Sequence, residues 1–211
     1  MRSFYPTGNA LERAFASLRH EGLGTFAWKL AAELGYRRIV RLERALHEPI
    51  PDVTLELPVT FGLLGADEID DYVAARPNAR QAEIASHLRA GRHCFVVRHE
   101  GRIVSACWAA TTACRSLYMG RDIELAEGDV YFTDAWTDPA LRGHALAHAL
   151  CVHQLRHFRE RGFRRAIRGT VPENPSALRA HAKSGFRPTL LQARLRIGGW
   201  QRNFDRPWRD R

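Results

Sequence analysis

The first 48 residues space their apolar side chains three to five positions apart, as on one face of a helix. Gly35 and two earlier glycines are expected to divide this stretch into two or three helical pieces. The sequence EPIPD, at residues 48–52, predicts a linker. We therefore expect a basic amphipathic helical arm with its linker over residues 1–50, and a second domain over residues 51–211. The apolar positions of the arm are Leu11, Ala14, Phe15, Leu18, Leu23, Phe26, Leu30 and Leu34.

From residue 58 the pattern changes to short apolar runs that alternate with helical periodicity. A tight turn at Glu100-Gly101 predicts a hairpin in the first half, and strand–helix alternation in the second half predicts parallel strands. The expected fold class is therefore mixed α/β. The predicted strands are 59–64, 93–99, 102–110, 130–137, 166–171 and 190–197, and the predicted helices are 66–76, 78–90, 142–161 and 175–184.

Composition narrows the classes of protein that fit. The chain has 211 residues, of which 45% are hydrophobic and 26% charged, as in ordinary globular domains. No apolar run approaches the ~18 residues of a membrane span, and the N-terminus lacks the apolar stretch of a secretory signal. We expect a cytoplasmic protein.

The balance of charges favours anionic partners. The formal net charge is +9, and residues 187–211 alone hold seven arginines and two aspartates. A positive surface suits phosphorylated small molecules, an acidic carrier protein, nucleic acid or an anionic membrane surface. In the tail, Trp200, Phe204 and Trp208 lie among arginines, which fits stacking on nucleic acid, a membrane interface or packing back over the domain. The last of these is preferred, and Pro207 argues against a continuous helix there.

Cysteines and histidines give little support to a metal centre. The four cysteines contain no CxxC pair, which argues against a zinc ribbon or a disulfide framework. His144, His148 and Cys151 have spacings that place them on one helix face, so a divalent metal is an alternative. Because no glutamate accompanies them as in HExxH, we expect no metal.

The segment TDAWTDPALRGHALAHAL, at residues 133–150, carries the clearest chemistry. It predicts a strand that ends at Thr137, a turn at Asp138-Pro139 and a helix that begins at Arg142-Gly143. The first amides of a helix have no intrahelical acceptor, and the helix dipole is positive there. This arrangement binds a phosphate or pyrophosphate.

Two motifs together resemble the GNAT superfamily of acyl-coenzyme A N-acyltransferases. Residues 142–147, RGHALA, are similar to its Q/R-x-x-G-x-G/A motif, and residues 174–186 are similar to its N-x-x-A and K-x-G-F elements. The resemblance covers about residues 58–198. It implies that the fourth and fifth strands of the fold diverge, and that the pantetheine arm of the coenzyme lies between them. It also implies cofactor contacts at Ala135, Trp136, Thr137, Arg142, Gly143, His144, Ala145, Leu146, Ala147 and Asn174.

The chain departs from the family pattern at two positions. Ala145 replaces the middle glycine of the motif, so a methyl group meets the phosphate site, although a helical alanine keeps its N–H. His181 stands where the family commonly has the tyrosine that protonates the leaving thiolate. An imidazolium of ordinary pKa, about 6.5, can also give a proton. A structural, solvent-facing His181 is the alternative.

A base for the attacking amine is expected on the same strand. Asp134 lies three residues before Thr137, where the family often has a glutamate, and can accept the ammonium proton directly or through water. The alternative is that Asp134 only hydrogen-bonds to backbone at a bulge. Glu127 and Asp129, near the start of the strand, are reserve candidates.

The sequence thus predicts an enzyme that transfers an acyl group, acetyl by default, from acyl-coenzyme A to an amine of a small and possibly anionic acceptor. An acyl carrier protein as alternative donor, and a homodimer, are left open. The competing hypothesis is an inactive binding module of the same fold, which uses its arginine-rich arm and tail on nucleic acid, lipid or a protein.

Overall fold

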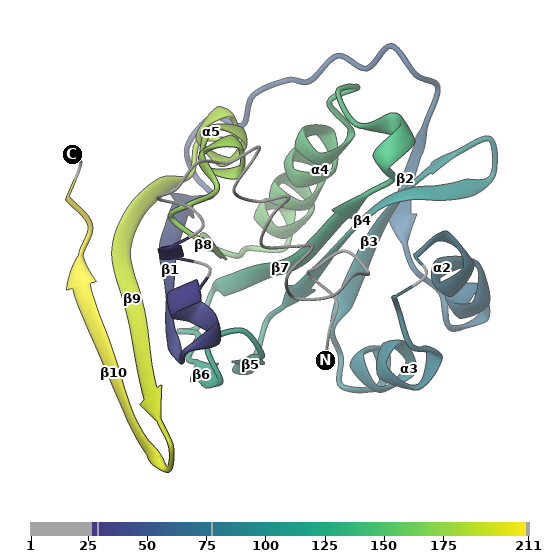
Figure 1. The fold of residues 1–211 in the computed structure, drawn as a ribbon. Helices are drawn as coiled ribbons and strands as arrows, with labels where there is room; N and C mark the ends of the chain where they lie inside the picture. Colours follow the sequence, from purple (N-terminus) through teal and green to yellow (C-terminus); the bar gives the residue numbers. More distant parts are fainter. Residues whose placement is uncertain (1–26, 29, 77, 210–211) are drawn as a thin grey trace.

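The computed structural model describes residues 27–28, 30–76 and 78–209. Figure 1 shows the arrangement of its strands and helices. The strands are β1 (Tyr36–Ala45), β2 (Thr60–Leu63), β3 (His93–His99), β4 (Arg102–Ala110), β5 (Cys114–Ser116), β6 (Arg121–Ile123), β7 (Asp129–Thr137), β8 (Arg165–Thr170), β9 (Arg187–Ile197) and β10 (Trp200–Pro207). The α-helices are α2 (Ile69–Ala75), α3 (Gln81–Arg89), α4 (Leu146–Glu160) and α5 (Pro175–Lys183), and the 3-10 helices are η1 (Ala66–Glu68) and η2 (Pro139–Leu141).

An eight-stranded sheet, ordered β10-β9-β1-β8-β7-β4-β3-β2, forms the centre of the molecule. Its neighbouring strands are antiparallel except for β7 and β8, which are parallel and joined through α4. Strands β5 and β6 pair only with each other. The predicted mixed α/β class is confirmed.

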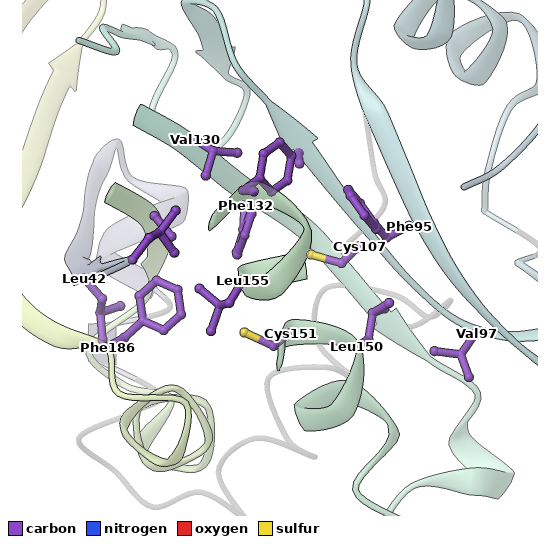
Figure 2. Packing of buried hydrophobic residues seen from close by; sticks show 14 of the residues in the cluster. Leu42, Phe95, Val97, Cys107, Val130, Phe132, Leu150, Cys151, Leu155 and Phe186 are labelled. Atoms are coloured by element: carbon purple, nitrogen blue, oxygen red, sulfur yellow. The ribbon is translucent and has the colours of Figure 1, made fainter. Parts of the chain in front are cut away.

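Alternation along the central strands gives the sheet two buried faces. Phe95 and Val97 of β3 pack under α4 in the largest cluster of buried apolar side chains (Figure 2). Cys94 and Val96, one position away on the same strand, pack with α2 and α3 in a second cluster. Helices α4 and α5 therefore cover one face, and α2 and α3 cover the other (Figure 1).

The predicted helical arm is wrong where it reaches the sheet. Tyr36–Ala45 is the strand β1, paired with β8 on one side and β9 on the other. Gly35, with φ of 104°, ends the helical residues 30–33, and the chain then alternates buried Val40, Leu42 and Arg44 with more exposed neighbours. Residues 1–26 of the arm lie outside the described residues, and the division of the chain at residue 50 stays a prediction.

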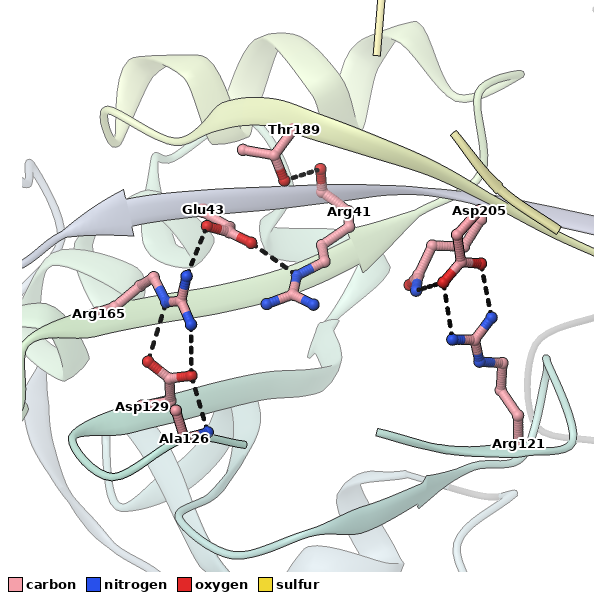
Figure 3. Close-up of polar contacts among 9 residues, drawn as sticks. Arg41, Glu43, Arg121, Ala126, Asp129, Arg165, Thr189 and Asp205 are labelled. Atoms are coloured by element: carbon pink, nitrogen blue, oxygen red, sulfur yellow. Dashed lines mark hydrogen bonds and ion pairs between the residues drawn. The ribbon is translucent and has the colours of Figure 1, made fainter. Parts of the chain in front are cut away.

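Polar side chains link β1 to other strands of the sheet, and the β5–β6 ribbon to the sheet (Figure 3). The guanidinium of Arg165 donates to Glu43 on β1 at 3.1 Å and to Asp129 on β7 at 2.7 and 2.9 Å, so it spans three strands. Arg121 of β6 donates to both carboxylate oxygens of Asp205 on β10, at 2.7 and 2.9 Å. These ion pairs hold together elements that are far apart in sequence.

The C-terminal tail forms the edge strand β10, which the sequence did not predict as a strand. It pairs with β9 along its whole length, and Trp208 packs against the main cluster of buried apolar side chains. Trp200 and Phe204 keep 52% and 41% of their surface exposed. Of the three aromatic residues of the tail, Trp208 therefore packs on the domain, whereas Trp200 and Phe204 are exposed to solvent. No helix within the described part of the chain is long and apolar enough to cross a membrane.

Candidate functional site

Strands β7 and β8 separate part of the way along their length. Their pairing runs from Asp129 opposite Arg165 to Phe132 opposite Arg168. Beyond Phe132, β7 continues to Thr137 against β4, while the last residues of β8 pair with β1. The edge of residues 133–137 that faces β8 thus has no strand partner among the described residues. The divergence of strands that the family resemblance implies is present.

A bulge in β7 marks the point of separation. The register between β4 and β7 shifts between Ala106 and Trp108, and Asp134 has a left-handed backbone with φ of 51°. Both carboxylate oxygens of Asp134 accept hydrogen bonds from Arg76, at 2.6 and 2.8 Å. Arg76 also donates to the hydroxyl of Tyr72 at 2.9 Å. The bulge is therefore clamped to the C-terminal end of α2.

The environment of Arg76 favours its charged form. The Arg76 side chain is only 8% exposed, whereas 34% of the Asp134 side chain is exposed. Burial opposes the charge on Arg76, but the hydrogen bonds and charge of Asp134 outweigh it and raise the pKa of Arg76. Burial likewise raises the pKa of Tyr72 to about 12. The side chain of Asp134 thus forms an ion pair with a guanidinium and is not bonded only to backbone.

At the predicted phosphate loop, the start of α4 differs from the start that the sequence predicts. Helix α4 begins at Leu146, not at Arg142, because Gly143 and Ala145 have φ of 94° and 57°. Ala145 is the N-cap and is not helical, so the expectation of an unstrained helical alanine is wrong. The first intrahelical bond runs from the N–H of Ala149 to the carbonyl of Ala145, at 2.9 Å. The amides of residues 146–148 precede it and have no intrahelical acceptor.

The loop before α4 is open to solvent. Arg142, Gly143, His144, Ala145 and Ala147 are exposed, whereas Leu146 is buried in the core. The polypeptide there combines free helical amides, the positive end of the helix dipole and an arginine side chain. An anion can approach all three.

A cavity of about 70 Å³ lies between this loop and the gap in the sheet. Its walls include Ala135 and Trp136 at the end of β7, Ala147 in the first turn of α4 and His181 of α5. Ser105 also lines it and donates to the carbonyl of Trp136 at 2.8 Å. The structure therefore brings together residues from both predicted motifs.

His181 does not have the properties expected of a proton donor. Burial, together with the positive charge of Arg168, lowers its pKa to about 3. Its imidazole is therefore neutral near pH 7. The imidazolium of ordinary pKa that the sequence suggested is not formed there.

Three other predicted residues lie away from the cavity. Asn174 caps α5 by accepting hydrogen bonds from the amide of Ala177 at 3.0 Å and the hydroxyl of Ser176 at 2.7 Å. Asp129, one of the reserve bases, is paired with Arg165, and Glu127 is exposed. Both lie near the start of β7, at the end opposite the gap. Asn174 therefore positions the helix that carries His181.

The described residues also show what sequence reasoning missed. Arg76 and Arg168 were not singled out, because arginines are abundant in the chain and their partners lie far away in sequence. Only Pro77, after Arg76, marks the end of α2. Within the described ranges no group of three or more His, Cys, Asp or Glu side chains converges to hold a metal ion.

Comparison with known proteins agrees with this geometry. Residues 63–186 match the Acetyltransferase (GNAT) family, and the chain belongs to that family. Members of the family transfer acyl groups from acyl-coenzyme A and use acetyl-coenzyme A as co-substrate. No curated protein matches the sequence.

Solved structures share the fold at low identity. A GNAT-family protein from Novosphingobium aromaticivorans is 21% identical with a TM-score of 0.52, and the alignment covers 75% of this chain and 65% of that one. A GCN5-related N-acetyltransferase from Sphaerobacter thermophilus is 19% identical with a TM-score of 0.55, over 88% of this chain and 58% of that one. This chain thus spans less than two thirds of the length of either structure.

Proposed function

We propose that this chain transfers an acyl group, acetyl by default, from acyl-coenzyme A to an amine of a small acceptor. The observation that carries the proposal is the separation of β7 from β8 after Phe132, beside the free amides at the start of α4. A thioester arm with amide groups needs an unpaired strand edge, and its diphosphate needs an anion site at one end of that edge.

The donor would lie along this path. The amides of its pantetheine arm would pair with the backbone of Ala135, Trp136 and Thr137, on the edge that faces away from β4. Its pyrophosphate would accept hydrogen bonds from the amides of residues 143–147, with Arg142 and His144 beside it. The arrangement leaves the α2 and α3 face of the sheet for the acceptor.

The chemistry would be direct attack of the amine on the thioester. Asp134 faces the acceptor side of the bulge and has 34% of its side chain exposed, so it can bind the incoming ammonium and receive its proton directly or through water. A backbone N–H near the bulge would stabilise the oxyanion. Because His181 is neutral, it would donate a hydrogen bond to the leaving thiolate rather than a proton.

The acceptor is proposed by class only. A net charge of +9 favours an anionic small molecule that carries an amine. The same charge suits an acidic carrier protein as an alternative donor, and a homodimer is compatible with the exposed edge strand β10.

Two measurements test the proposal. First, coenzyme A and acetyl-coenzyme A should raise the melting temperature of the protein. Second, mass spectrometry should find acylated amines after the protein and acetyl-coenzyme A are incubated with a cell extract of small molecules. A protein that no coenzyme A compound stabilises, but that nucleic acid retains in a salt-sensitive manner, would instead support the binding-module hypothesis.

A further inference from the structure

One buried arginine at the cavity has no carboxylate partner among the residues that the structure describes. Arg168 on β8 is 7% exposed. Within the described part of the chain its guanidinium contacts the thiol of Cys151, 3.5 Å from Nη1, and the ring of Phe186, whose centroid lies 5.5 Å from Cζ. By contrast, Arg76 is paired with Asp134, and Arg44 donates to two carbonyl oxygens. A buried cation without an anion is costly, so this position suits a ligand that supplies one.

A second buried polar group on the cavity wall is incomplete. Gln154 on α4 is fully buried, and its Nε2 donates to the carbonyl of Cys107 at 3.2 Å. Within the described ranges its Oε1 accepts no hydrogen bond. Arg168, Gln154, Cys107 and Cys151 are all buried and form the floor of the cavity, and Figure 2 places both cysteines between α4 and the sheet. Oε1 is an acceptor, so a carboxylate would not satisfy it. The group on this floor that an anionic ligand completes is the guanidinium of Arg168, which lines the cavity and is buried.

The cavity joins this floor to the proposed donor path. Its outer wall is formed by the end of β7 and by Ala147 and Ala180, which are exposed, whereas the floor lies deeper between α4 and β8. A volume of about 70 Å³ exceeds the ~10–15 Å³ that one water needs, so the floor has room for a few heavy atoms. Acetyl would leave the guanidinium without a partner.

We propose that the floor binds the distal carboxylate of a dicarboxylic acyl group, such as succinyl, carried by coenzyme A. Arg168 pairs with the carboxylate, and the thioester stays beside the bulge of β7. This inference rests on the proposed function, because it names the acyl class that the same site prefers.

The reaction would leave the bound carboxylate unchanged. The amine nitrogen attacks the thioester carbonyl carbon, an amide C–N bond forms, and the carbon–sulfur bond breaks. The sulfur leaves with the bonding electron pair, and the proton lost by the amine ends on the thiol. The products are free coenzyme A and an amide that ends in a carboxylate.

Calorimetric titration of the whole protein tests the inference without an acceptor. The probes are coenzyme A, acetyl-coenzyme A, butyryl-coenzyme A and succinyl-coenzyme A, of which the last two have the same four-carbon chain. Wild type should bind succinyl-coenzyme A about tenfold or more tightly than butyryl-coenzyme A, because a charge-assisted pair forms only with the former.

Variants assign that preference to Arg168. In Arg168→Met the ratio of the two affinities should fall to about one. In Cys151→Asp it should fall likewise, because the new carboxylate lies next to the guanidinium, and this variant decides the matter if Arg168→Met does not fold. The control Arg159→Met removes one positive charge from the exposed end of α4 and should keep the ratio.

The outcomes distinguish failure of the inference about the acyl group from failure of the proposed function. If acetyl-coenzyme A binds but succinyl-coenzyme A binds no better than butyryl-coenzyme A, the inference is overturned and the proposed function stands. Equal weakening of all four ligands in Arg168→Met also overturns it, since Arg168 would then contact the coenzyme itself. If none of the four binds, the proposed function fails, and the inference fails with it.

Discussion

Among the described residues, three that are not glycine have a left-handed backbone, and two of these lie at the candidate site. Asp134 forms the bulge of β7, and Ala145 caps α4 beside the free amides. Such a backbone costs an L-residue about 1–2 kcal/mol. Both positions therefore hold strain where the coenzyme is proposed to bind, and Asp134 is held there by its ion pair with Arg76.

Replacing Ala145 with glycine should relieve this strain. We expect Ala145→Gly to change the free energy of unfolding by about 0 to +1 kcal/mol, because relief of the left-handed backbone exceeds or balances the added entropy of the unfolded chain. It should also bind acetyl-coenzyme A more tightly, since no methyl group meets the phosphate. Urea unfolding and calorimetry measure the two effects.

The same substitution at a helical alanine should change the free energy of unfolding in the opposite direction. Ala182 is exposed and lies within α5. Ala182→Gly should therefore lower the free energy of unfolding by about 1 kcal/mol. If Ala145→Gly destabilises as much as Ala182→Gly, the strain assigned to Ala145 is absent.

The buried imidazole of His181 predicts a pH dependence of stability. Its pKa is lowered to about 3, so between pH 3 and the ordinary value of ~6.5 the unfolded chain binds a proton that the folded chain does not. Its contribution to stability is complete above about pH 6.5 and is lost as the pH falls. His181→Gln should make the dependence of unfolding free energy on pH shallower between pH 6 and 4, by up to ~1.4 kcal/mol per pH unit. An unchanged slope would show that His181 titrates normally.

Other histidines act in the same direction and do not hide this effect. Desolvation also lowers the pKa of His87, His93, His148, His153 and His157. The variant should therefore keep part of the wild-type slope. What is compared is the difference between the two proteins at each pH.

Sequence reasoning reached some residues of the site and not others. The motif spacing identified the loop at 142–147 and the positions of Ala145 and His181, because these features are local. It could not give the φ of Ala145 or the burial of His181, which depend on the packed structure. Arg76 and Asp134 lie 58 positions apart, so no local pattern predicts their pairing.

At the scale of elements, the Arg76–Asp134 pair links α2 to the bulge of β7. Strand β7 therefore receives support from α2 on one face of the sheet and from α4 on the other. The bulge turns the end of β7 away from β8. We expect the separation of the two strands to depend on this clamp.

Asp134→Asn tests the clamp while keeping the backbone. Asparagine tolerates the left-handed region, so the strain of the bulge changes little. The buried guanidinium of Arg76 loses its anion, and the free energy of unfolding should fall by about 1–3 kcal/mol. Asp122→Asn breaks an exposed pair with Arg115 and should cost less than ~1 kcal/mol. Equal losses for the two variants would argue against the clamp.

Strands that are continuous apolar runs beside a tight turn were predicted to the residue, whereas β1 and β10 were missed. The predicted bounds of β3 and β4 are those observed, because apolar runs flank a Glu100-Gly101 turn in which both residues have positive φ. The helical spacing of the earlier leucines predicts a helix that continues past Gly35, which is why it misses β1. β10 was missed because all of its residues are exposed, so its side chains show no burial pattern. Its strand form comes from pairing with β9.

On the scale of the whole molecule, the sheet separates the proposed donor side from the proposed acceptor side. Helices α4 and α5 border the cavity and the proposed phosphate loop, whereas α2 and α3 lie on the side proposed for the acceptor (Figure 1). The pairing of β7 with β8 ends between these faces, at Phe132. A donor and an acceptor approaching from opposite sides would meet at the bulge.

Reversing the charge at the loop should weaken donor binding. Arg142→Glu puts an anion beside the proposed diphosphate, and we expect the affinity for acetyl-coenzyme A to fall at least about tenfold by like-charge repulsion. Arg102→Glu makes the same change of charge at the exposed start of β4 and should have a much smaller effect. Calorimetry at physiological salt compares them. Equal affinities in the two variants would refute the placement of the diphosphate.

A crystal structure of the protein with coenzyme A bound examines the main claim most directly. We predict density for the pantetheine arm between residues 133–137 of β7 and the end of β8, with the diphosphate within hydrogen-bond distance of the amides at 143–147. Coenzyme bound elsewhere, or β7 and β8 paired along their full length, would contradict the account.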